Sequence, residues 1–164
     1  MNNLLKFVKR ITTTVVLAAL MVSFATPVMA APVNNNAEAE QIALELYPDA
    51  TVVRTKFESK RNGNSYYEVK LVQDDVRVEV KIDAATGALR PRYDQNLFDI
   101  ASITPTQARN TALNLHPGAT VRYTELEYEN GVLVYEVELT QANGRKAEVH
   151  INAETGAVLK NRAR

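Results

Sequence analysis

Residues 43–52 read Ala-Leu-Glu-Leu-Tyr-Pro-Asp-Ala-Thr-Val, and residues 112–121, sixty-nine positions later, read Ala-Leu-Asn-Leu-His-Pro-Gly-Ala-Thr-Val. Two more stretches return in the same order: Tyr-Glu-Val-Lys-Leu at 67–71 as Tyr-Glu-Val-Glu-Leu at 135–139, and Asp-Ala-Ala-Thr-Gly-Ala at 83–88 as Asn-Ala-Glu-Thr-Gly-Ala at 152–157. Self-similarity at a fixed period indicates repeated supersecondary units. The period of about seventy residues is long enough for each copy to form a small fold, so we interpret the chain as an internal duplication.

Residues 1–30 have the three parts of a secretory signal peptide. Three basic residues lie within the first ten positions, an apolar stretch runs from 11 to 25, and Val28-Met29-Ala30 is a small-residue cleavage motif. The alternative is an uncleaved membrane anchor, but the apolar stretch contains three threonines and is followed by Pro27, which leaves it short of the about 20 residues that a spanning helix needs. We therefore expect cleavage after Ala30, no stable membrane anchor, and a periplasmic or secreted location.

The residues that remain after cleavage carry a small negative charge. The signal contains three of the nineteen Lys and Arg residues and no Asp or Glu, which leaves 16 basic against 19 acidic residues and a net charge of −3. Binding to a phosphate backbone depends on clustered Lys and Arg, so we expect no nucleic-acid partner. The chain has no cysteine, hence no disulfide and no acylated N-terminal cysteine, and its core has to hold the fold together.

The repeats divide the rest of the chain into four segments. Residues 31–36, Ala-Pro-Val-Asn-Asn-Asn, show no periodicity and are predicted to be a flexible leader. The first repeat is expected at 37–90 and the second at 103–164. The segment between them, 91–102, contains several large apolar residues and is therefore predicted to be a packed connector. Each repeat is close to sixty residues, a size at which a lone domain is marginally stable, so docking of the two copies would stabilise both.

Each repeat is predicted to begin with a helix and to continue with strands. Apolar residues recur at helical spacing over 39–46 and 108–115, and both helices should end before Pro48 and Pro117, because proline disfavours helical geometry in the preceding residue. The period then changes to two, for example at 133–139, with turn signals between the runs. We therefore predict an α+β fold of two tandem units, each a helix packed on a three- to four-stranded antiparallel sheet.

Two stretches, 83–87 and 152–156, begin with Asp or Asn and end with Gly, which suggests either a calcium loop or a tight turn. A calcium loop needs six or more oxygen ligands from alternate positions. Alanines stand at such positions in both stretches. A turn accounts for every residue, because Asp and Asn bond the backbone two residues on and Gly takes the left-handed position. We therefore predict hairpin turns and no bound metal there.

Residues suited to catalysis are few. After Ala30 the chain has three serines and two histidines, His116 and His150. His116 lies at a predicted helix end, and His150 alternates with apolar neighbours and is therefore expected to point to solvent. Two such histidines rarely make a zinc site without further ligands at suitable spacing. We predict no enzyme activity, no catalytic residue, no cofactor and no metal.

The outward positions of the two predicted sheets carry opposite charge. In the first repeat five of them are basic and three are acidic, whereas in the second five are acidic and one is basic. Three interpretations follow. The two faces contact each other, within one chain or between two; they form a docking surface for a partner; or they are ordinary solvated faces of antiparallel sheets. The candidate protein-binding residues are Arg54, Lys56, Lys70, Arg77, Lys81, Tyr123, Glu125, Glu127, Glu136 and Glu138.

The repeated motifs resemble those of the PepSY domain, a small extracytoplasmic module found in the propeptides of secreted metallopeptidases and in stand-alone envelope proteins. The resemblance rests on the Ala-Leu-x-x-x-Pro-x-Ala-Thr-Val helix end, the Tyr-Glu-Val-x-Leu strand and the Asp/Asn-Ala-x-Thr-Gly-x-Leu/Val terminus. It covers nearly all of the chain after the signal, twice. The tandem arrangement is also similar in shape to the secreted β-lactamase inhibitory protein, with no shared motif.

This resemblance implies peptidase inhibition or a related regulatory contact. We therefore expect a non-catalytic protein-binding module that inhibits or modulates a separate, extracytoplasmic peptidase. The alternative is an envelope scaffold or stress-related protein whose partner is not a peptidase, with self-association as one form of it.

Overall fold

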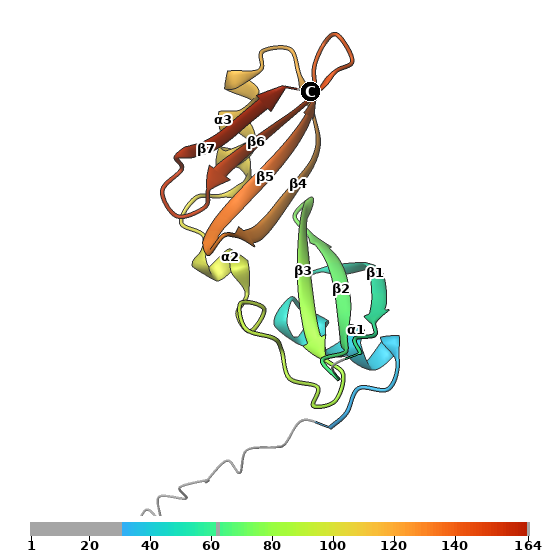
Figure 1. Ribbon diagram of the computed structural model, residues 1–164. Coiled ribbons are helices and arrows are strands. Elements are labelled where there is room, and N and C mark those ends of the chain that lie inside the picture. Colours follow the sequence, from blue (N-terminus) through green and yellow to red (C-terminus); the bar gives the residue numbers. More distant parts are fainter. Residues whose placement is uncertain (1–30, 62, 164) are drawn as a thin grey trace, which may run out of the picture.

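The computed structural model of the chain describes residues 31–61 and 63–163 and shows an α+β fold, as predicted (Figure 1). The predicted signal peptide at 1–30 lies outside the described residues. None of the described helices has the length and apolar character needed to cross a membrane. In chain order the elements are α1 (Asn36–Leu46), β1 (Thr51–Glu58), β2 (Tyr66–Gln73), β3 (Val76–Asp83), α2 (Leu97–Ile100), α3 (Pro105–Leu115), β4 (Thr120–Glu129), β5 (Val132–Thr140), β6 (Lys146–Asn152) and β7 (Val158–Ala163).

All seven strands belong to one sheet, ordered from β1 to β7 as in the sequence. Neighbouring strands are antiparallel except β3 and β4, which pair in parallel through two residue pairs, Val76 with Thr124 and Arg77 with Glu125. The prediction of two separate sheets did not include this bridge, because pairing between repeats leaves no mark in the periodicity of either. α1 packs on β1 to β3 and α3 on β4 and β5, and both helices lie on the same side of the sheet (Figure 1).

Local sequence sets the ends of the two long helices. Asn35 caps α1, its side chain accepting a hydrogen bond from the backbone N–H of Glu38 at 3.0 Å. Thr104 caps α3 in a capping box with Gln107, and Pro105 occupies the first turn. Both helices end just before their prolines, as the sequence predicts.

Residues 31–36 are not the flexible leader that the sequence suggested. Val33 is buried, and its backbone N–H donates to the carbonyl oxygen of Ala84 at 3.0 Å. α1 already begins at Asn36, within this segment. The lack of periodicity was misleading, because one buried side chain and a few backbone hydrogen bonds are enough to hold so short a segment against the sheet.

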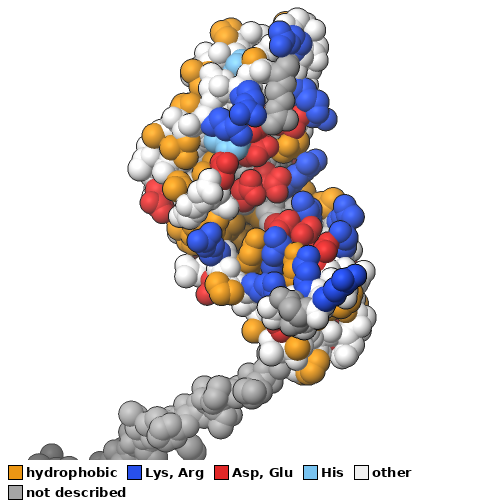
Figure 2. Space-filling view, viewed as in Figure 1, with side chains coloured by type: hydrophobic (Ala, Val, Ile, Leu, Met, Phe, Trp, Pro, Cys, Tyr) orange, Lys and Arg blue, Asp and Glu red, His pale blue; other side chains and the backbone are white. Residues whose placement is uncertain are grey.

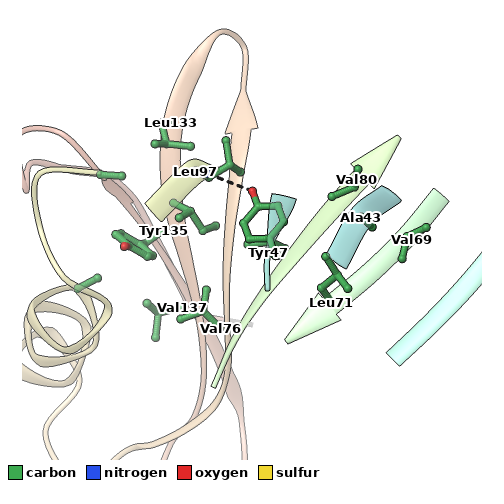
Figure 3. Packing of buried hydrophobic residues seen from close by; sticks show 14 of the residues in the cluster. Ala43, Tyr47, Val69, Leu71, Val76, Val80, Leu97, Leu133, Tyr135 and Val137 are labelled. Carbon is green, nitrogen blue, oxygen red and sulfur yellow. Dashed lines mark hydrogen bonds between the residues drawn. The ribbon is translucent and has the colours of Figure 1, made fainter. Parts of the chain in front are cut away.

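Tyr47, at the end of α1, joins the first half of the sheet to the connector (Figure 3). It is only 1% exposed, and its hydroxyl oxygen accepts a hydrogen bond from the backbone N–H of Leu97 at 3.0 Å. Its ring meets that of Phe98 edge to face, with 6.3 Å between the ring centroids. Leu97 is itself buried, so the connector packs against the end of α1 through the short helix α2.

Arg109 on α3 ties the second half of the sheet to the first. Its Nη2 donates to the carbonyl oxygens of Asp74 at 3.0 Å and Asp75 at 2.9 Å, in the β2–β3 turn, and its Nε donates to Oγ1 of Thr124 at 3.0 Å. Thr124 is the residue of β4 that pairs with Val76 of β3. A charged side chain therefore supports the parallel bridge in addition to the backbone hydrogen bonds.

Replacing Tyr47 by phenylalanine should destabilise the fold by about 1–3 kcal/mol, because the N–H of Leu97 loses its buried acceptor. Urea unfolding followed by far-UV circular dichroism measures the change. The matched control is Tyr67→Phe, which removes a hydroxyl from another buried tyrosine outside this contact and should cost less. Equal losses for the two variants would show that the hydrogen bond between α1 and the connector contributes nothing of its own.

Stability should also fall at high pH. Burial raises the pKa of Tyr47 to about 12, although the hydrogen bond from Leu97 opposes the shift, and burial raises the pKa of Tyr135 to about 12. Unfolding returns both phenols to an ordinary pKa of 10.0, so the unfolded state loses these protons first. The stability that the two raised pKa values contribute is fully present below pH 10.0, the ordinary pKa, and disappears as the pH approaches about 12. Urea midpoints measured over that range should decline, and the decline should be shallower in Tyr47→Phe. An equally steep decline in the variant would show that the pKa of Tyr47 is not raised in the folded state.

Candidate protein-binding face

The side of the sheet opposite α1 and α3, which we call the outward face, carries the ten predicted protein-binding residues. Strand register aligns them: Arg54 lies opposite Lys70, and Glu125 opposite Glu136. Figure 2 shows Asp and Glu side chains gathered near the middle of the molecule, with Lys and Arg side chains on both sides. The two charged faces are therefore neighbours on one surface and do not stack against each other within the chain.

The first half of the outward face carries a basic strip on β1 to β3, made of Arg54, Lys56, Lys70, Arg77 and Lys81. Its charge is partly compensated within the strip itself. A carboxylate oxygen of Glu79 lies 2.7 Å from the ammonium of Lys81, and the other lies 3.4 Å from that of Lys70. Burial alone would lower the pKa of Lys81, but hydrogen bonds to Glu79 and Tyr93 raise it, so this residue remains charged.

Arg77 lies where the two halves meet. It is opposite Glu125 in the parallel bridge, and its guanidinium carbon lies 4.4 Å from the centroid of the Tyr123 ring, a cation–π contact across the junction. The hydroxyl of Tyr123 donates to Oε1 of Glu136 at 3.2 Å. Burial and the carboxylates of Glu138 and Glu136 raise the pKa of Tyr123, which keeps it a hydrogen-bond donor.

The second half carries an acidic patch on β4 and β5, made of Glu125, Glu127, Glu129 and Glu136. Burial raises the pKa of Glu125 and of Glu127, and repulsion from neighbouring carboxylates adds to both shifts. Lys70 opposes the shift at Glu125, whereas the neighbouring charges that shift the pKa of Glu127 most are all carboxylates. Within the described residues, neither carboxylate forms an ion pair with Lys or Arg. The patch is therefore under-compensated, and a cationic group from outside would be stabilised there.

Glu138 is not counted in this patch, because its negative charge is already paired. Its carboxylate forms ion pairs with Arg122 and, at 3.1 Å, with Lys146. Burial alone would raise the pKa of Glu138, but hydrogen bonds from Tyr123, Lys146 and Arg122 lower it. Of the acidic residues predicted to bind a partner, Glu138 is thus the one whose charge the chain already neutralises.

His150 does not point to solvent as the alternating pattern suggested. It lies on the outward face, but it is only 3% exposed, because Glu129 from β4 and Glu148 from β6 cover its ring. The pattern could not reveal this, since both of these contacts depend on the register of the folded sheet. His116, by contrast, is half-buried at the end of α3, and its Nε2 lies 2.7 Å from Oδ1 of Asn161.

The two edges of the sheet expose apolar side chains that no pattern in the sequence marks. On β1, Val53 is 63% and Phe57 is 47% exposed. On β7, at the opposite edge, Val158 is 43% and Leu159 is 51% exposed. Val53 stands at an irregularity in the pairing of β1 with β2. An exposed strand edge offers unpaired backbone groups to another chain, so both edges are candidate contact surfaces.

Comparison with known proteins finds the family. The family model of PepSY, described as peptidase propeptide and YPEB domain, matches the chain twice, at 36–90 and 102–162. The match confirms the resemblance seen in the repeated motifs.

Individual relatives are more distant. Protein YkoJ of Bacillus subtilis (strain 168) is 30% identical over 100 residues, which are 60% of this chain and 58% of YkoJ, so the chain spans somewhat more than half the length of this relative. Two solved structures are also similar. They are the YpmB protein from Bacillus subtilis (20% identity, 76% of this chain and 96% of that chain, TM-score 0.37) and a DUF2874 family protein from Bacteroides uniformis ATCC 8492 (17% identity, 79% and 90%, TM-score 0.40).

Replacing Glu127 by glutamine should stabilise the protein at neutral pH by up to about 1 kcal/mol after solvent screening, because the change removes a half-buried charge from among other carboxylates. Thermal unfolding at low and high salt measures the gain, which should shrink as salt screens the repulsion. Glu154→Gln, in the exposed turn between β6 and β7, is the control and should leave stability unchanged. A loss of stability in Glu127→Gln would mean that the patch is compensated after all.

Proposed function

This chain belongs to the PepSY family, and we propose that it is a non-catalytic, extracytoplasmic binding protein that modulates a secreted or envelope peptidase. The family description names peptidase propeptides, which supports a peptidase as the partner class. In this proposal residues 1–30 direct the chain to the periplasm or the medium. The segments 37–90 and 103–164 act as two tandem helix-and-sheet units joined by the connector 91–102.

The observation that carries the proposal is the exposed edge of β1. One side of this strand pairs with β2, and no other strand of the described residues pairs with its outer side. Val53 and Phe57 present apolar surface there, and the ring of Phe57 rests on Tyr67 with 5.0 Å between centroids. An extended segment of a partner can add to such an edge, with backbone hydrogen bonds for affinity and apolar side chains for specificity.

Charge would select the partner strand. Two residues of the basic strip lie on β1 itself. Lys56 is already paired with Glu58, so Arg54 is the residue that favours a partner segment with an acidic residue at this edge. The β1 edge would hold this segment of the peptidase in place. This chain supplies only the binding edge and no active site, so it takes no part in cleavage. Occupation of the peptidase in this way would inhibit or modulate it.

A second candidate is favoured by the charge separation on the outward face. The basic strip and the acidic patch lie on one surface, which makes that surface complementary to a second copy of itself about a two-fold axis. An envelope scaffold that self-associates, or that binds a non-peptidase partner, would use this surface and leave the β1 edge free.

Capture of partners separates the two candidates. Immobilised protein, residues 31–164, is incubated with the host's envelope and secreted fractions, and bound proteins are identified by mass spectrometry. Any peptidase recovered is then titrated with the free protein. A fall in its activity to completion at one equivalent supports the proposal. Recovery of non-peptidase proteins alone, or of the protein itself, supports the scaffold.

Val53→Lys should weaken binding to the recovered peptidase at least about tenfold, because a lysine on an exposed edge disfavours the addition of another strand. Inhibition titrations of the peptidase measure the loss. The matched control is Val158→Lys, the same change on the opposite edge, which should inhibit like the unaltered protein. If Val53→Lys inhibits equally well, the β1 edge is not the binding site, whatever the partner.

A further inference from the structure

His150 lies at the centre of a group of carboxylates on the outward face. Its Nδ1 is 2.6 Å from Oε2 of Glu129, and its Nε2 is 2.7 Å from Oε1 of Glu148 and 3.5 Å from Oε2 of Glu136. The imidazole is almost fully buried and Glu148 is nearly as well covered, whereas Glu136 and Glu129 reach the surface. The proposed docking surfaces assign no role to this buried ring.

Strand register brings these groups together. Glu136 on β5 lies directly opposite His150 on β6, and Glu148 precedes His150 by two residues and so projects from the same face. Both strands are interior strands of the sheet, with neighbours on either side. The donor atoms of these three residues lie within 4.8 Å of one another. The site is therefore built on rigid elements and needs no loop movement to assemble.

The Nε2 side of the ring requires a positive charge beside it, and the ammonium of Lys160 supplies that charge in this structure. With the N–H on Nδ1, the ring donates to Glu129, and the lone pair of Nε2 then faces the carboxylates of Glu148 and Glu136. A lone pair and two anions repel unless a cation lies among them. A histidine whose Nδ1–H is held by a carboxylate while Nε2 binds the ion is the usual arrangement around protein-bound metals.

The geometry points to a divalent metal site of the zinc class, with Nε2 of His150 and carboxylate oxygens of Glu148 and Glu136 as ligands. Zinc bonds of about 2.0–2.2 Å place tetrahedral ligand atoms roughly 3.4 Å apart, and the separations of 2.7 and 3.5 Å bracket that value. One imidazole with carboxylates suits zinc and similar ions better than calcium or magnesium, which prefer oxygen alone. Glu129 is the positioning residue that orients the ring.

Lys160 of β7 shares this space. Its Nζ lies 2.5 Å from Oε1 of Glu148 and 3.3 Å from Nε2 of His150. With a neutral ring the three carboxylates of Glu129, Glu136 and Glu148 carry a charge of −3, and a divalent ion that displaces the ammonium supplies one more positive charge than the ammonium does. The Lys160 side chain is one third exposed, so it can swing into solvent as the ion enters.

The test begins with the unaltered protein. Metal-free protein is titrated with zinc chloride by calorimetry, and the histidine nitrogens are followed by NMR. We expect one ion per chain and a large shift of Nε2 of His150, with the ring of His116 unaffected. No binding, or binding that leaves Nε2 of His150 unshifted, overturns the site. Neither result bears on peptidase modulation, which is measured separately.

Variants then identify the ligands. Glu136→Gln and His150→Gln should each weaken zinc binding at least about tenfold, whereas His116→Gln should bind normally. Glu136 is partly exposed, so its variant keeps the test decisive if the change at the buried His150 prevents folding. Unchanged affinity in a folded Glu136→Gln variant counts against the assigned ligand set.

Glu129 and Lys160 can be tested apart from the ligands. Glu129→Gln should reduce affinity by about tenfold and leave the absorption spectrum of bound cobalt unchanged, because the ligand set stays the same. Lys160→Met removes the competing ammonium and keeps the apolar stem, so it should tighten binding several-fold. Affinity that does not rise in Lys160→Met would contradict the displacement of Lys160 by the ion.

Discussion

The parallel bridge between β3 and β4 is the constraint on which the rest of the structure depends. Only two residue pairs form it, Val76 with Thr124 and Arg77 with Glu125. So short a ladder has little stability of its own, and two other contacts hold the halves in place: the hydrogen bond that the connector's Leu97 N–H donates to the hydroxyl of Tyr47, and the hydrogen bonds of Arg109 to the β2–β3 turn. Because these contacts set the register, both helices cover one side of the sheet and the other side becomes a single surface.

That single surface explains the electrostatics of the protein. Glu79 partly neutralises the basic strip, whereas the half-buried carboxylates of the acidic patch have few cations near them. Repulsion of this kind costs stability, and proteins retain such arrangements most often where another molecule supplies the missing charge. We propose that in this chain the β1 edge takes a partner strand, and that the acidic patch and the group around His150 take cationic groups or an ion.

Local features of the fold were predictable from the sequence, and long-range ones were not. The helix ends before Pro48 and Pro117 and the period-two strands follow from local geometry. The β3–β4 bridge pairs residues almost fifty positions apart, and neither strand carries a signal for it. The surroundings of His150 could not be predicted for the same reason: alternation shows which face the ring is on, but Glu129 and Lys160 reach it from two other strands. The charged faces were visible in the pattern, although their adjacency was not.

The two copies carry different residues at the position that His150 occupies in the second copy. The repeat places Lys81 at the position of His150 and Glu79 at that of Glu148. In the first copy the ammonium of Lys81 lies 2.7 Å from Glu79, so a covalently attached cation satisfies the carboxylate. In the second copy an imidazole stands at that position, and the nearest cation comes from another strand on a partly exposed side chain. Where the first copy has one lysine, the second thus has an imidazole with a partly exposed lysine beside it, which is the arrangement that the proposed zinc site requires.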